Sequence, residues 1–255
     1  MSRRLVLTLL GTAAIVASCA VEPRASSVSE TALPSPSAIE QPTQSPREMV
    51  LCPSRVLGSC RGPLTPGTYR ANEFETPFSY TVPEGWANYE DLPGNFLLLP
   101  PGEELAGVNN DTSEFIGLYD GVAPASANCD EVREPGIGVT PEAMATWYAS
   151  HPGLSTSEAQ SVSIGGLEGL VIDLDLADDH AATCPYAHAG EPLVPLLIGN
   201  GPAGLHHLLN ASFTTRLYLL TAPGGETIAI EVVDHDGRMT LEELSAVVEM
   251  IEFGL

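Results

Sequence analysis

The sequence contains no lysine, and apart from histidine its only basic residues are ten arginines. The 33 aspartates and glutamates outnumber them and give a formal net charge of −23. Without a lysine amine the chain cannot carry out P-loop phosphate binding, Schiff-base chemistry or Ser-Lys nucleophilic catalysis. The negative charge also makes nucleic acid and anionic lipid headgroups unfavourable partners.

Several sequence signatures of catalysis are also missing. The chain has no G-x-S-x-G, H-E-x-x-H, S-x-x-K or C-x-x-C segment, which argues against serine-hydrolase, zinc-protease and thiol-oxidoreductase chemistry. Hydrophobic residues nevertheless make up 44% of the chain and charged residues 17%, a composition typical of a folded domain. We therefore expect a globular domain with no catalytic residue, cofactor or metal that the sequence identifies.

The first 18 residues predict a bacterial lipoprotein signal peptide. Arg3 and Arg4 precede an apolar stretch, residues 5–16, that is too short to cross a bilayer of about 30 Å as a stable helix. The segment Val16-Ala17-Ser18-Cys19 resembles a lipobox, in which the cysteine thiol accepts diacylglycerol. We expect lipidation at Cys19, and hence a protein anchored by lipid alone to the outer face of the cytoplasmic membrane.

The mature chain divides into a tether and one folded domain. Residues 19–49 begin with the lipidated Cys19 and are rich in Pro, Ser and Thr, which predicts a disordered tether. Residues 50–255 contain the periodic apolar segments and predict a single α+β domain.

Four cysteines remain once Cys19 is assigned to lipid. An even number in an exported domain predicts two structural disulfides, although four cysteines allow three pairings. We favour Cys52 with Cys60, which closes a small loop, and Cys129 with Cys184, which joins two long polar loops.

Apolar and polar residues alternate with a period of two in several segments, and this alternation predicts two hairpins and several single strands. The first hairpin joins residues 161–164 through Gly165-Gly166 to residues 170–176, and the second joins residues 214–221 to residues 226–233. Asp173 and Asp175 fall on one face of the first hairpin, where we expect them to form a solvated acidic face together with Glu231. Further strand candidates are residues 78–82, 96–99, 115–119 and 193–198.

Two segments predict helices. Thr140-Pro141-Glu142 supplies a cap, a first-turn proline and an acid, and this helix should end at His151-Pro152-Gly153. Thr240 to Glu243 forms a capping box ahead of an apolar stripe that runs to Ile251. We therefore expect an α+β fold in which two main helices pack on an antiparallel β-sheet of six to eight strands.

The order of these segments resembles a group of uncharacterised actinobacterial lipoproteins and, more remotely, Mog1/PsbP-like domains. The resemblance rests on Pro83-Glu84-Gly85-Trp86, on the helix around Trp147, on the two hairpins and on the C-terminal segment IEFG, and it covers residues 75–255. These motifs are structural, so the resemblance implies a fold and a compartment but no reaction.

Three motifs suggest ligands but have simpler explanations. Residues 199–204 spell G-x-G-x-x-G, yet the segment after them is too short for the helix that dinucleotide binding needs. His180, Cys184 and His188 have zinc-ligand spacing, but Pro185 and a disulfide at Cys184 oppose such a site. Residues 234–237 with Glu243 match only part of an EF-hand loop and favour a tight turn.

The function indicated by these features is a non-enzymatic binding or interaction module at the cell envelope. Its ligand would be apolar or glycolipid-like, or its partner an envelope protein. One alternative is an envelope hydrolase that uses the carboxylates of Asp173 and Asp175 or the imidazoles of His206 and His207. The other is a metal-binding lipoprotein that uses His180 and His188.

The lipid anchor can be tested in the host. A Cys19→Ala variant should accumulate as an unprocessed precursor or be released from membranes, because no thiol accepts the diacylglycerol. Membrane fractionation and immunoblotting measure this outcome. A variant that stays membrane-bound at its mature length would contradict lipidation at Cys19.

Overall fold

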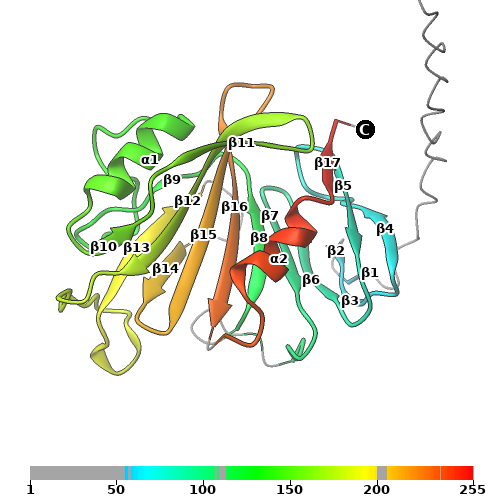
Figure 1. Ribbon diagram of the computed structural model, residues 1–255, viewed down its shortest axis with the longest axis horizontal. Coiled ribbons are helices and arrows are strands. Elements are labelled where there is room, and N and C mark those ends of the chain that lie inside the picture. Colours follow the sequence, from blue (N-terminus) through cyan, green and yellow to red (C-terminus); the bar gives the residue numbers. More distant parts are fainter. Residues whose placement is uncertain are drawn as a thin grey trace, which may run out of the picture. The chain divides into compact units, whose positions relative to one another are not determined.

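The chain forms a β-rich fold around one large antiparallel sheet of nine strands (Figure 1). The computed structural model describes residues 55–56, 59–106, 108, 113–199, 206–235 and 237–254, with backbone only at residues 55, 56, 59, 60 and 206. The strands, in spatial order from one edge, are β10 (Leu154–Thr156), β12 (Leu167–Leu176), β15 (Phe213–Thr221), β16 (Thr227–His235), β8 (Phe115–Tyr119), β7 (Asn95–Leu99), β6 (Ala87–Leu92) and β3 (Gly62–Pro63), and β11 (Gln160–Ile164) also pairs with β12.

Smaller sheets and two α-helices complete the described part of the chain. The smaller sheets are β14 (His206–Asn210), β13 (Leu193–Ile198) and β9 (Ala123–Pro124); β17 (Ile251–Phe253), β5 (Phe78–Val82) and β4 (Gly67–Arg70); and the pair β1 (Arg55–Val56) and β2 (Ser59–Cys60). The helices are α1 (Pro141–Ser150) and α2 (Leu241–Val248), with a short 3-10 turn, η1, at His188–Gly190.

This architecture corrects the predicted fold class. The expected α+β fold with one sheet of six to eight strands is wrong, because the central sheet alone has nine strands and further sheets lie beside it. The α-helices are short, with ten and eight residues, so the fold is mostly antiparallel β-structure. Short strands such as β6, β10 and β14 account for the difference, since each has too little apolar alternation to stand out in the sequence.

Both predicted hairpins are present in the sheet. The turn between β11 and β12 places Gly165 and Gly166 at φ of 55° and 86°, a backbone conformation that glycine adopts without steric cost. Strands β15 and β16 pair along nine residues each and form the middle of the sheet. The predicted helix starts are also confirmed, with Thr140 capping α1 and a complete capping box formed by Thr240 and Glu243 at α2.

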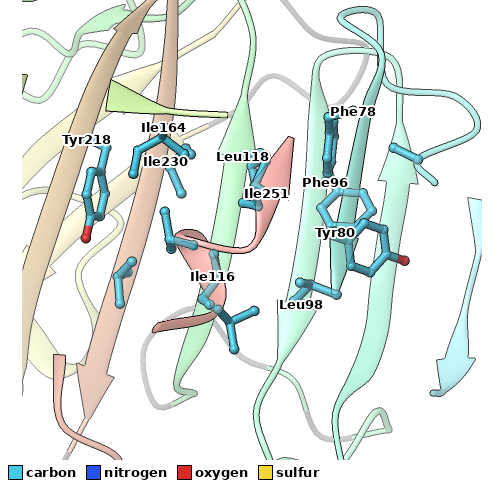
Figure 2. Close-up of a cluster of buried hydrophobic side chains, with 14 of the residues drawn as sticks. Phe78, Tyr80, Phe96, Leu98, Ile116, Leu118, Ile164, Tyr218, Ile230 and Ile251 are labelled. Carbon is cyan, nitrogen blue, oxygen red and sulfur yellow. The ribbon is translucent and has the colours of Figure 1, made fainter. Parts of the chain in front are cut away.

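One face of the central sheet packs against α2 and the β17-β5-β4 sheet. We call this cluster of buried side chains the α2 core. The central sheet contributes every second residue of its strands, such as Tyr218, Ile230 and Ile116. Figure 2 shows Phe78 and Tyr80 of β5 against Phe96 of β7, with ring centroids 4.9 and 5.0 Å apart. In Figure 1, α2 lies in front of the central sheet on this face, and it contacts β16.

The opposite face packs against α1 and the β14-β13-β9 sheet. We call this second cluster the α1 core. Leu217, Leu219 and Ala229 from the central sheet face Tyr148 of α1 and Leu196 of β13. Tyr148 Oη donates a hydrogen bond to the Leu196 carbonyl at 2.9 Å, so α1 is tied directly to the smaller sheet.

The helices of the described residues were compared with the requirements of a membrane span. None of the helices in that part of the chain combines the length and the apolar character that a membrane span needs. The segments that predict a signal peptide, lipidation at Cys19 and a tether lie outside the described residues.

A glycine on β12 offers a test of the central sheet. An added Cβ at Gly169 would lie 2.0 Å from the Leu219 carbonyl oxygen of β15, so the strands would have to separate. We expect Gly169→Ala to lower the free energy of unfolding by about 1–3 kcal/mol. Gly224→Ala is the control, because nothing lies within 4 Å of the added atom. Urea unfolding measures both variants, and equal stability of the two would contradict this packing.

Candidate functional site

A polar groove opens where β12 ends and β15 begins. Its cavity volume is about 740 Å³, and its lining includes three carboxylates (Asp175, Asp178 and Asp234), His180 and three serine or threonine hydroxyls. Because neither arginine nor lysine lines it, the groove presents mostly hydrogen-bond acceptors and negative charge. This arrangement suits a ligand that carries hydrogen-bond donors.

The sheet register assembles one side of the groove. Thr214 of β15 is paired with Asp175 of β12 on one side and with Asp234 of β16 on the other. Thr214 Oγ1 donates a hydrogen bond to Asp175 Oδ1 at 2.8 Å, and Asp234 Oδ1 accepts one from the Gly237 amide at 2.9 Å. Three neighbouring strands therefore present a row of polar side chains at the end of the sheet, and the rest of each carboxylate can bind a ligand.

The other side of the groove is the loop of residues 177–192, which we call the groove loop. The predicted disulfide between Cys129 and Cys184 is present and joins this loop to the segment before α1. It closes a loop of 55 residues, which is worth about 4 kcal/mol in chain entropy. The second predicted pair lies outside the described residues, which include neither Cys52 nor the side chain of Cys60.

A histidine holds the groove loop at its start. The imidazole of His180 lies over Gly153, where an added Cβ would come within 2.7 Å of the ring. Its Nε2 lies 3.1 Å from the Leu193 carbonyl oxygen, which can only accept a hydrogen bond, so Nε2 carries the proton. His180 thereby connects the groove loop to β13.

A second, smaller groove of about 340 Å³ lies along the α2 face of β12. Its charged centre is Arg216, whose guanidinium binds both carboxylate oxygens of Asp173 at 2.7 and 2.9 Å. Arg216 also reaches Glu242 at 3.2 Å and Ser245 at 3.3 Å on α2. The hydrogen bonds that Arg216 donates to Asp173 raise the pKa of Arg216 above its usual value. This network connects α2 to the sheet. It also pairs Asp173 with the Arg216 cation, so Asp173 does not belong to the solvated acidic face that the sequence predicted.

The buried polar groups of the α1 core form a separate cluster. Glu231 of β16 is only 1% exposed, so the expectation that it belongs to a solvated face is wrong. His207 Nδ1 lies 2.7 Å from Glu231 Oε2, and the His207 ring packs between Phe115 and Tyr119. Gly117, the register partner of Glu231, leaves space for the Tyr119 ring to fold back over it. A buried charge requires such a partner, so we assign the pair to the structure of the core.

Burial perturbs the titration of the groups around this pair. Burial, followed by the charge of Glu231, raises the pKa values of Tyr119 and Tyr148 well above the usual 10.0. Burial also raises the pKa of Glu90 above its usual 4.5, although the charges of Arg61 and His207 oppose the shift. Such clusters occur in active sites, but neither groove is lined by any of these residues.

The alternative metal site suggested by the spacing of His180, Cys184 and His188 lacks its sulfur ligand, because Cys184 forms a disulfide. Cys184 is oxidised, His180 lies in the groove and His188 is exposed on η1. Within the described ranges no group of three His, Cys, Asp or Glu side chains could hold a metal ion. The predicted turn at residues 234–237 and the capping role of Glu243 explain the partial EF-hand pattern.

The dinucleotide motif lies largely outside the described residues. It is followed by the strand β14, which pairs antiparallel with β13, and not by a helix. A pyrophosphate would need a helix N-terminus at this point. The sequence did not reveal the groove itself, since its lining comes from several segments between Ser155 and Gly237 that only the sheet register brings together.

Comparisons with known proteins assign no family. No protein-family model matches the chain, and no curated protein matches it. A crystal structure of a protein from Bacteroides thetaiotaomicron VPI-5482 is similar to this chain at 14% identity and a TM-score of 0.32. The similarity covers 70% of this chain and 45% of that protein, so the chain spans less than half of its length. Neither fold nor function can be transferred at this level.

The buried pair can be tested with a double-mutant cycle. The single variant His207→Leu should lower the free energy of unfolding by about 3–5 kcal/mol, because it leaves the Glu231 carboxylate buried without its partner, and Glu231→Leu is the other single variant. The double variant His207→Leu with Glu231→Leu should lose less than the sum of the two single variants, since no charge remains in the core. Urea unfolding at neutral pH measures all four proteins. Additive losses would contradict the pairing.

Proposed function

We propose that the protein is a lipid-anchored binding module of the cell envelope, lipidated at Cys19, which holds a polar ligand in the groove at the ends of β12 and β15. The observation that carries this proposal is the groove itself. Its volume of about 740 Å³ is within the range of small-molecule sites. The signal peptide and lipobox in the sequence support the location at the outer face of the cytoplasmic membrane.

The lining of the groove favours a ligand rich in hydroxyl groups. Carboxylates accept short, strong hydrogen bonds from hydroxyls, and Asp175, Asp178 and Asp234 approach the groove from three different segments. An anionic ligand would meet only like charge there. Of the ligands suggested by the sequence, the sugar headgroup of a glycolipid therefore fits best.

The described surface gives little support for capture of an acyl chain. Val132 is the one large apolar side chain that is strongly exposed among the described residues, at 54%. A lipid chain or an apolar ligand needs a continuous apolar patch or tunnel. Recognition would therefore involve the headgroup, while the lipid part stays in the membrane.

The alternative functions gain no specific observation. A hydrolase based on Asp173 and Asp175 would need two available carboxylates, but Arg216 occupies both oxygens of Asp173. A hydrolase based on His207 would need access to a side chain that is 5% exposed. We therefore retain the binding module as the proposed function.

The proposal predicts that the groove carboxylates contribute to binding. In flotation assays with residues 19–255 carrying Cys19→Ala, so that no acyl chain of the protein inserts into the bilayer, we expect retention on vesicles that carry neutral glycolipids and not on vesicles of phospholipid alone. Asp175→Asn with Asp178→Asn should weaken binding about tenfold or more, because each change removes a charged hydrogen-bond acceptor.

The control for this experiment is Glu168→Gln. Glu168 is an exposed acid near the start of β12 that lines neither groove, and its substitution removes one negative charge without changing the site. Equal binding by all three proteins, or no binding by the wild type, would overturn the assignment of the groove. Binding to proteins of the envelope alone would favour a protein partner instead.

A further inference from the structure

A pair of histidines joins the end of α1 to the groove loop. His151 is the residue that caps the C-terminus of α1, and His180 lies in the groove loop. Gly153 lies between them, with its amide directed at His151 and its Cα beneath the His180 ring. The two imidazoles thus approach one backbone segment from two different parts of the chain.

The hydrogen bonds fix the protonation state of His151. The Gly153 amide donates to His151 Nδ1 at 3.1 Å. Because a backbone N–H can only donate, Nδ1 must be unprotonated in this structure. Protonation of His151 would place a hydrogen on Nδ1 facing another hydrogen, and this bond would be lost.

The same segment positions the groove loop. The Gly153 carbonyl accepts a hydrogen bond from the Ala177 amide at 3.0 Å, and Ala177 lines the groove. The His180 amide donates to the Ala177 carbonyl at 2.9 Å, and the His180 ring continues to Leu193. A displacement of Gly153 would therefore move the groove wall, because Gly153 is hydrogen-bonded to Ala177 and contacts the His180 ring.

The surroundings of His151, taken together, oppose its protonation. Burial, followed by the charge of His180, lowers the pKa of His151 below its usual 6.5, while Glu134 acts in the opposite direction. The facing groups are His180 from the groove loop, Glu134 from the segment before α1 and the Trp147 ring of α1, whose centroid is 5.0 Å from that of His151. Of these, Glu134 and the Trp147 ring would stabilise the imidazolium, while His180 opposes it.

We propose that His151 and His180 form an acid-sensitive latch, in which neutral His151 holds the groove loop closed and protonation of His151 releases it. The consequence for ligand binding rests on the function proposed above, because the latch would regulate the same groove. The release itself does not depend on a ligand.

The direction of the pH effect follows from linkage. A histidine whose pKa is lowered in the folded state binds fewer protons there than in the open or unfolded state. Neutral His151 contributes fully to closure above pH 6.5, which is the usual pKa of a histidine. This contribution is lost as the pH falls from 6.5 toward the lower pKa of His151 in the folded state.

Amide hydrogen exchange tests the latch on the full chain. Between pH 7.5 and 5.5, after correction for intrinsic exchange rates, we expect the protection of residues 177–183 to fall about tenfold, while β15 and β16 keep their protection. Retained protection of β15 and β16 also verifies that the protein stays folded. Unchanged protection of residues 177–183 in the wild type would overturn the proposal.

Two substitutions separate the latch from a merely structural role. In His151→Asn, the asparagine side chain still accepts a hydrogen bond from the Gly153 amide, as in an Asx-turn, but it does not titrate. The groove loop of this variant should therefore stay protected at both pH values. His188→Asn removes an exposed histidine of the same loop and should behave like the wild type. A pH response that persists in the His151→Asn variant would assign the effect to another group and overturn the latch.

The same variants distinguish the latch from the proposed function. If the loop opens on acidification but glycolipid vesicles do not bind at any pH, the groove assignment fails and the latch stands. If vesicles bind equally at both pH values while the loop opens, the latch does not regulate that ligand, and this part of the proposal fails.

Discussion

The burial of both faces of the β15–β16 hairpin is the constraint on which the rest of the structure depends. Alternate residues of the two strands enter the α2 core and the α1 core, and hardly any of them is exposed. Full burial of one large apolar side chain is worth about 1.5–3 kcal/mol, so neither face can remain uncovered. A separate layer of one helix and one small sheet therefore covers each face.

Glu231 is a buried acid in this largely apolar pattern, and several features around it reduce the free-energy cost of burying its carboxylate. Its register partner is glycine, its carboxylate faces His207, and aromatic rings enclose that histidine. An unpaired carboxylate at this depth would be strongly destabilising. The pair also links β14 to the central sheet, so it fixes the position of the smaller sheet as well as the charge balance of the core.

The sequence was informative where local patterns decide the structure. The caps at Thr140 and Thr240, the hairpin turn at Gly165 and the strand Phe115–Tyr119 are all encoded by neighbouring residues. Short strands such as β10 and β14 were missed because tertiary pairing, and not their own alternation, makes them strands. The disulfide could be predicted because an even number of cysteines, in a chain that the sequence predicts to be exported, favours structural bridges.

The candidate site could not be predicted for a different reason. Asp175 and Glu231 have the same appearance in sequence, as acids at alternating positions of a strand, but one lines a groove and the other is buried. The face to which each points depends on the register between hairpins that are distant in sequence. Pairing across β12, β15 and β16 aligns Asp175, Thr214 and Asp234, and no local signal marks that row.

The attachments of the groove loop determine how far it can move. The disulfide at Cys184 and the start of β13 at Leu193 hold its second half covalently and by sheet pairing. The first half, from Ala177 to Thr183, is held by the Gly153 carbonyl, by His180 and by the Leu193 amide, which donates a hydrogen bond to the Ala182 carbonyl at 3.1 Å. These are single noncovalent contacts near the surface, and they are weak compared with the two cores. A change at His151 can therefore alter one side of the groove while the hairpin that supports the other side stays in place.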